Sequence, residues 1–98
     1  DDYTQAISVN SNFALAYNNR GNARAAQGDR EGAIADYNEA ILKAPNFAAA
    51  YNNRGNAYAA LGDKQKAIED LQRAAQIFEK QNNKQLYQQV MDNMKEVE

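Results

Sequence analysis

Tyr-Asn-Asn-Arg-Gly-Asn-Ala, at residues 17–23, occurs again without change at residues 51–57. The similarity extends beyond this block, because residues 48–81 match residues 14–47 at 17 of 34 positions when they are aligned at an offset of 34. A 34-residue period is typical of repeat proteins, in which each repeat is one supersecondary unit that stacks on its neighbours. The rest of the chain is therefore read in relation to this repeat.

The apolar residues of each repeat recur at steps of three or four, which is the period of a helix and not of a strand. We therefore predict four helices, at about 13–27, 30–43, 47–61 and 64–80. The first of them places four residues on one apolar face: Phe13, Tyr17, Gly21 and Arg24. Each repeat is thus expected to be a pair of helices.

The residues between these helices are typical of helix ends. Gly28-Asp29 and Gly62-Asp63 lie inside each pair, where glycine ends one helix and aspartate caps the next. Asn12 and Asn46 are expected to cap the first helix of each pair in the same way. Pro45 helps to end the helix before it, because the residue that precedes a proline avoids the helical conformation.

The two ends of the chain differ from the repeats. Asp2–Phe13 matches Asp36–Phe47 at six of twelve positions, so we interpret residues 1–13 as the remnant of a preceding repeat and the chain as a fragment of a longer protein. Residues 82–98 predict one more helix with an apolar side formed by Leu86, Tyr87, Val90, Met91, Met94 and Val97. We interpret it as a capping helix, because the end of a repeat stack must be covered. The alternative is a helix that docks into a partner.

The repeats resemble the tetratricopeptide repeat (TPR), a helix-turn-helix unit with characteristic aromatic, small and proline positions. The first repeat matches this pattern at Tyr17, Gly21, Ala33, Tyr37, Ala40 and Pro45, and the second at Tyr51, Gly55, Tyr58, Ala67, Leu71 and Ala74. The Tyr-Asn-Arg-Gly form is similar to repeats of cyanobacterial and plastid proteins. Arg20 and Arg54 stand where the family has leucine. Because Asp36 and Asp70 also recur at one phase, we expect Arg–Asp pairs between neighbouring helices.

The resemblance implies an all-α fold, a right-handed α-α superhelix or TPR solenoid that ends in the capping helix. Residues 1–98 would form one TPR domain, divided into a remnant (1–13), two repeats (14–47 and 48–81) and the capping helix (82–98). It also implies a non-catalytic scaffold that binds a partner protein or peptide through its concave face.

The first helix of each pair is expected to line that concave face. Residues at steps of three, four and three share one stripe of a helix. The candidate peptide-binding residues on these stripes and beside them are Leu15, Asn18, Asn19, Asn22, Ala25, Ala49, Asn52, Asn53, Asn56 and Ala59. Asparagine amides both donate and accept, as a peptide backbone requires. The alternative is that these amides only hold neighbouring helices together.

Some TPR proteins hold a C-terminal carboxylate with lysines and asparagines on the concave face. By resemblance, Asn22 and Asn53 occupy the asparagine positions of this clamp. Asn18 stands where its first lysine would be, and residues 83–87 supply neither of its later basic residues. The sequence therefore argues against a carboxylate clamp in this segment.

Composition excludes several other functions. The net charge of −2 and the pI of about 5.1 do not favour nucleic acid, which requires a basic face. No apolar run approaches the roughly 20 residues that membrane insertion requires. Cysteine and histidine are absent, which removes thiolate zinc sites and the commonest general base. We therefore expect no enzyme activity, cofactor or metal.

Two further expectations concern the compartment and the oligomeric state. The absence of cysteine suits an intracellular reducing compartment, either the cytoplasm or a plastid or cyanobacterial one. The alternative to a peptide-binding function is a self-association module that forms a homo-oligomer through uncovered helix faces, because exposed apolar faces promote association.

Overall fold

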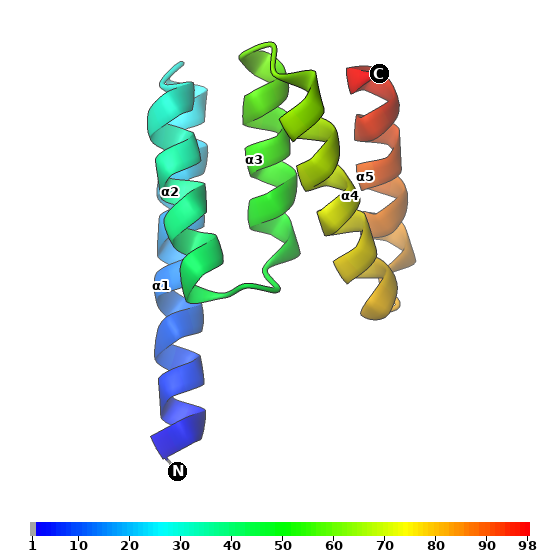
Figure 1. Cartoon of the computed structure of the whole chain (residues 1–98). Coiled ribbons are helices and arrows are strands. Elements are labelled where there is room, and N and C mark those ends of the chain that lie inside the picture. The colour runs from blue at the N-terminus through cyan, green and yellow to red at the C-terminus, as the bar shows by residue number, and fades with distance from the viewer. Residues whose placement is uncertain (1) are drawn as a thin grey trace.

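The computed structural model describes the backbone of residues 2–98 and the side chains of residues 12–98. This part of the chain folds into five α-helices: α1 (Asp2–Ala26), α2 (Arg30–Lys43), α3 (Ala48–Ala60), α4 (Lys64–Lys80) and α5 (Lys84–Val97). Consecutive helices are antiparallel and are joined by short turns (Figure 1). The predicted all-α stack of helix pairs is confirmed.

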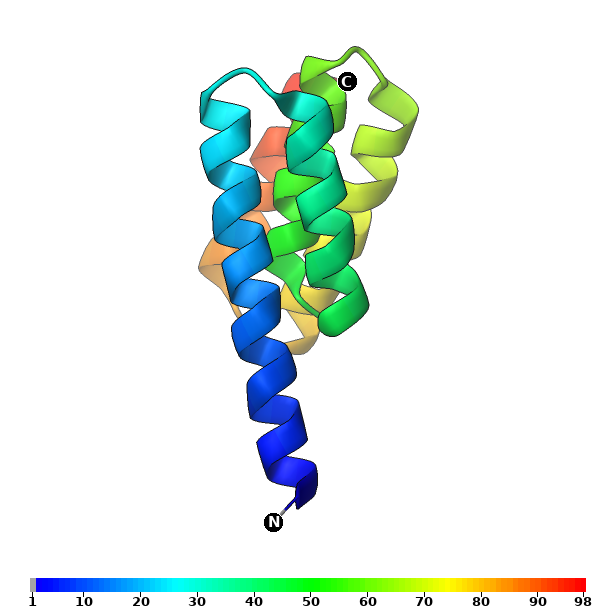
Figure 2. The same ribbon diagram turned by 90° about the vertical axis from the view of Figure 1, so that its left-hand side faces the viewer.

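The helices form two layers. In the inner layer α3 contacts both α1 and α5, whereas α2 and α4 pack on the other side and do not contact each other. In the view of Figure 2, α1 and α2 lie nearest to the viewer and form one end of the stack. The inner layer therefore presents one surface made of three helices, α1, α3 and α5.

The predicted start of a helix at Asn12 is wrong, because α1 is one continuous helix from Asp2 to Ala26. The first part of α1 extends past the end of α2 (Figures 1 and 2). The physical reason lies at residue 11, where Ser11 stands at the position that Pro45 occupies one repeat later. Pro45 interrupts a helix, whereas nothing in the corresponding segment of α1 does so.

The turns inside the pairs follow the prediction. Gly28, Gly62 and Asn82 have positive φ angles of 88°, 89° and 57°, and each ends a helix in the left-handed conformation. The residue that follows each of these three caps the next helix. The side-chain oxygens of Asp29, Asp63 and Asn83 accept hydrogen bonds from backbone N–H groups, at 3.0, 3.2 and 3.1 Å respectively. Asn46 does not cap α3, because Phe47 occupies the N-cap position without a side-chain bond.

The main core lies where α5 covers α3 and α4. It contains eight buried residues, Ala48, Leu71, Ala74, Ala75, Ile77, Phe78, Val90 and Met94. Tyr87, Met91 and Val97 of α5 pack against this cluster as well. Leu86 was expected on the same side, but 37% of it is exposed because it lies at the edge of the apolar stripe.

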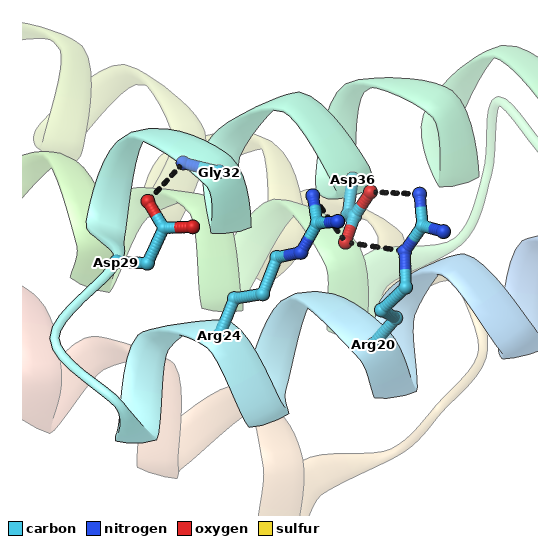
Figure 3. Close-up of polar contacts among 5 residues, drawn as sticks. All are labelled: Arg20, Arg24, Asp29, Gly32 and Asp36. Atoms are coloured by element: carbon cyan, nitrogen blue, oxygen red, sulfur yellow. Dashed lines mark hydrogen bonds and ion pairs between the residues drawn. The ribbon is translucent and has the colours of Figure 1, made fainter.

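One bidentate Arg–Asp pair joins the two helices of each repeat, as predicted. The Arg20 Nε and Nη2 atoms donate to Asp36 at 2.9 and 2.7 Å, and Arg24 Nη1 lies 3.4 Å from the same carboxylate (Figure 3). Arg54 donates to Asp70 in the same geometry, at 2.8 and 2.7 Å. Both aspartates are buried. The Arg20 side chain is 55% exposed and that of Arg54 is 20% exposed, so the Arg54–Asp70 pair differs more from the exposed pairs that contribute little to stability.

We expect Asp36→Asn to lower the free energy of unfolding by about 1.5–3 kcal/mol at neutral pH, the usual contribution of a hydrogen bond to a charged group. The hydrogen bonds from Arg20 hold the pKa of Asp36 below its ordinary value. A carboxyl whose pKa is lowered on folding stabilises the protein above its unfolded pKa of about 3.9, and this contribution is lost as the pH falls through the folded pKa. Urea unfolding of both proteins between pH 7 and pH 2 measures the difference.

The matched control is Glu69→Gln, which neutralises an exposed carboxylate on α4. Its unfolding free energy should stay close to that of the native protein at every pH. A loss of stability in Asp36→Asn that stayed constant down to pH 2 would show that the carboxylate charge is not the source of the effect.

Candidate functional site

The candidate site is the surface of the inner layer, to which α1 and α3 supply the residues singled out from the sequence. Those residues differ in exposure. Leu15, Asn19, Asn22 and Asn56 are exposed, and Ala25, Ala49, Asn52, Asn53 and Ala59 are half-buried. Asn18 is buried, with 6% of its surface exposed. Nine of the ten candidate residues therefore reach the surface, and Asn18 lies beneath it.

Two of the amides link neighbouring inner helices. Asn53 Nδ2 donates to Asn18 Oδ1 at 3.0 Å, which ties α3 to α1. Asn93 Nδ2 donates to Asn52 Oδ1 at 3.4 Å, which ties α5 to α3. These bonds agree with the alternative reading that part of the asparagine row holds the helices together. They also fix the spacing of the three helices that form the surface.

Asn22 is held by a residue of the outer layer. The Tyr37 hydroxyl donates to Asn22 Oδ1 at 2.6 Å. Burial raises the pKa of Tyr37, so this hydroxyl stays protonated and remains a donor. This bond uses one of the two lone pairs of the Asn22 oxygen, whereas the amide nitrogen makes no hydrogen bond with another described residue and can donate to a ligand.

A first hollow of about 220 Å³ lies on the surface between α1 and α3. Its lining consists of Ala25, Arg30, Tyr37, Asn53, Asn56, Ala57 and Ala60. The alanines leave room for a guest side chain, the tyrosine and asparagines supply polar atoms, and Arg30 supplies a positive charge.

A second hollow of about 330 Å³ lies between α3 and α5. It is lined by Asn56, Ala59, Ala60, Lys64, Asn93, Glu96 and Val97. Asn56 and Ala60 line both hollows, so the two are adjacent on either side of one turn of α3. The Asn56 side chain is exposed and makes no hydrogen bond with another described residue, which leaves its whole amide available.

The structure brings together four of the candidate residues, Ala25, Asn53, Asn56 and Ala59, around these hollows. The other six candidates line neither hollow: Leu15, Asn18, Asn19, Asn22, Ala49 and Asn52. Arg30 and Lys64 were not predicted from the sequence. A signal for them exists, because they lie 34 residues apart and each directly follows a Gly-Asp turn. Asn93, Glu96 and Val97 had no such signal, since α5 departs from the repeat.

The described residues show neither a metal-ligand cluster nor a membrane span. Within this part of the chain, no group of three or more potential metal ligands comes together. The same residues contain no helix that combines the length and the apolar character of a membrane span.

Comparisons with known proteins agree with the repeat pattern. A family model described as TPR repeat matches residues 21–62, and one described as Tetratricopeptide repeat matches residues 48–81. Among solved structures, the TPR2B-domain:pHsp70 complex of yeast Sti1 is similar at a TM-score of 0.82 and 32% sequence identity. The similarity covers 87% of this chain and 68% of that one. No curated protein matches at a significant level. From the two family models and this structural likeness we conclude that the chain belongs to the tetratricopeptide repeat family.

Proposed function

We propose that this chain is a non-catalytic binding module that holds an extended segment of a partner protein along the surface of α1, α3 and α5. The observation that carries the proposal is the pair of adjacent hollows that share Asn56. Each hollow can take one side chain, and the amide between them can bond the backbone that connects two such side chains.

The size of the hollows favours a peptide over a small molecule. Small-molecule sites are commonly clefts of about 300–1,000 Å³ that enclose most of the ligand. Here the space is divided into two open parts of about 220 and 330 Å³. Divided space of this kind suits a chain that places successive side chains in successive sites.

The polar groups on the surface suit a peptide backbone as well. Backbone N–H and C=O groups both need partners when a peptide leaves water. The Asn56 amide can donate and accept, and the Asn22 amide can donate. Asn18 is buried under the surface, so its role in the proposal is to hold Asn53 in place and not to touch the ligand.

The family comparison gives independent support for a protein partner. The TPR2B domain of yeast Sti1, with which this chain shares its fold, was solved in complex with pHsp70. Because Asn18 stands where the first clamp lysine would be, we do not expect a C-terminal carboxylate clamp to hold the partner segment.

We expect the double variant Asn22→Ala/Asn56→Ala to bind its peptides about 10–100-fold more weakly, if each lost hydrogen bond contributes ~0.5–1.5 kcal/mol. The test selects peptides from a random library against the native chain, synthesises them and measures their dissociation constants by calorimetry. NMR shift changes on the native chain should map to both hollows.

The control variant is Asn46→Ala/Gln72→Ala, which removes two exposed amides that lie outside α1, α3 and α5. It should bind with native affinity. Equal binding by the native chain and both variants, with shift changes on α2 and α4 instead, would place the binding surface on the outer layer and refute the proposal.

A further inference from the structure

The two hollows of the inner layer differ in the charges that line them. Among the described residues, Arg30 is the only charged one around the first hollow, and no carboxylate lines it there. The second hollow is lined by two charged residues of opposite sign, Lys64 and Glu96. The lining of the first hollow therefore carries one positive charge, whereas that of the second is neutral.

The charge of Arg30 is not compensated within the part of the chain that the structure describes. Its side chain makes no ion pair or hydrogen bond with another described residue. One acidic neighbour in sequence, Asp29, accepts a hydrogen bond from the backbone N–H of Gly32 at 3.0 Å (Figure 3). The other, Glu31, is exposed and lies outside the lining of the hollow. The Arg30 guanidinium is therefore available to an acceptor on a ligand.

Helix stability does not account for a cation at this position. Arg30 is the first residue of α2, and Lys64 is the first residue of α4. The N-terminal end of a helix carries a partial positive charge, so a cation in the first turn is unfavourable. Around the second hollow, Glu96 supplies the opposite charge. The first hollow leaves that part to a ligand.

The other groups around the first hollow suit an acidic side chain. Three alanines, Ala25, Ala57 and Ala60, leave room for its methylene groups in a space of about 220 Å³. The Asn56 amide makes no hydrogen bond with another described residue, so its nitrogen can donate. A carboxylate is an acceptor with two oxygens, and a guanidinium can bind both of them through parallel hydrogen bonds. An aspartate or glutamate thus offers acceptors to both Arg30 and Asn56.

We propose that the first hollow binds the carboxylate of an aspartate or glutamate side chain within the partner segment, and that Arg30 selects for this residue. The inference rests on the proposed binding function and adds the chemical class of one bound residue. In that function the segment continues past Asn56 into the second hollow. The carboxylate is therefore that of a side chain and not that of a chain terminus, and the neutral second hollow adds no comparable selection for charge.

Selected peptides test the proposal. They are taken from a random library whose variable residues lie between fixed flanking residues, and they are synthesised with amidated C-termini, so no terminal carboxylate contributes. One position should be occupied by aspartate or glutamate. Changing that residue to its amide should weaken binding about tenfold, the lower end of what a hydrogen bond to a charged group contributes. Arg30→Gln should weaken binding of the acidic peptide to the same extent and should leave binding of the amide peptide unchanged.

Charge reversal separates ligand binding from a structural role of Arg30. Arg30→Glu should bind the acidic peptide more weakly than Arg30→Gln does, and a peptide with lysine at the acidic position should restore its binding. Glutamine and glutamate are good helix formers, so both variants should keep native helicity by circular dichroism. Arg73→Gln is the matched control, because Arg73 is an exposed arginine on α4 that lines neither hollow. It removes the same charge and should bind with native affinity.

The possible failures differ between this inference and the proposed function. Peptides that shift NMR signals at both hollows, yet lack an acidic residue or bind Arg30→Gln with native affinity, overturn this inference alone. Equal weakening by Arg73→Gln and Arg30→Gln would trace the effect to net charge and also overturns it. A selection that yields no peptide bound at the hollows overturns the proposed function, and this inference with it.

Discussion

Tyr37→Ala should lower the free energy of unfolding by about 3–5 kcal/mol, the usual cost of truncating a large buried aromatic side chain. Tyr37 is 2% exposed and packs with Ala33 and Ala57, so it joins its own repeat to the next. Its ring also lies over Gly21, where even a methyl group would come within 2.6 Å of a ring carbon. The α1 backbone at Gly21 therefore lies directly against the ring. Because glycine has no side chain, it cannot fill the space that the truncated ring would leave. Urea unfolding measures the loss.

Tyr37→Phe separates the ring from its hydroxyl. It removes only the hydrogen bond to Asn22 and should cost ~0.5–1.5 kcal/mol. Tyr51→Ala offers a second comparison, because Tyr51 is only half-buried beside the main core and should cost less than Tyr37→Ala. A Tyr37→Ala protein as stable as Tyr37→Phe would show that the ring does not join the repeats.

Deleting residues 84–98 should abolish cooperative unfolding and cause aggregation. This segment contains α5, whose Val90 and Met94 are 1% and 7% exposed within the main core. Fully burying one such side chain contributes about 1.5–3 kcal/mol, and the deletion also exposes the residues of α4 that α5 covers. Native small domains are stable by only about 5–15 kcal/mol, so the loss is a large fraction of the total. Thermal unfolding followed by circular dichroism, with light scattering, tests this.

Two point variants accompany the deletion. Val90→Ala should lower stability measurably, whereas Gln89→Ala changes an exposed neighbour on the same helix and should have little effect. A soluble, fully helical deletion protein would contradict the capping role and would favour a docking role for α5.

The helices could be predicted from sequence because their ends carry strong local signals. Gly28, Gly62 and Asn82 are residues that adopt the left-handed conformation at low cost, and the structure uses all three in this way. The mistake at Asn12 has a local explanation too. Asn12 is a favourable cap, but the segment has Ser11 in place of Pro45, and without a proline the helix continues.

Burial was harder to predict than helix position. Phe13 and Phe47 occupy the same position in the repeat, yet Phe13 is half exposed because α1 has no preceding helix against it among the described residues. Tyr37 and Tyr51 are equally aromatic, and only the packing of α2 against α3 decides that Tyr37 is the more buried. Tertiary contacts of this kind are not a property of the local sequence.

The candidate site could be predicted only in part, again because tertiary contacts are not a property of the local sequence. The repeat period located the α1 and α3 stripes, including Asn53 and Asn56. It could not show that Asn18 lies under the surface, nor that Asn93 on α5 completes the second hollow. The first depends on the distance between α1 and α3, and the second on a helix that does not follow the repeat.

The bonds of Arg54 have a consequence for how the stack opens. This one guanidinium is bonded to Asp70 on α4 and to Asn38 on α2, so it belongs to two successive repeats at once. Stability in repeat proteins is the sum of the intrinsic stability of each unit and the coupling between neighbours. If α2 unfolds, Arg54 loses its hydrogen bond to Asn38 and keeps only its bonds to Asp70. Slow amide protons of α2, α3 and α4 are therefore expected to exchange with similar opening free energies, as one cooperative unit.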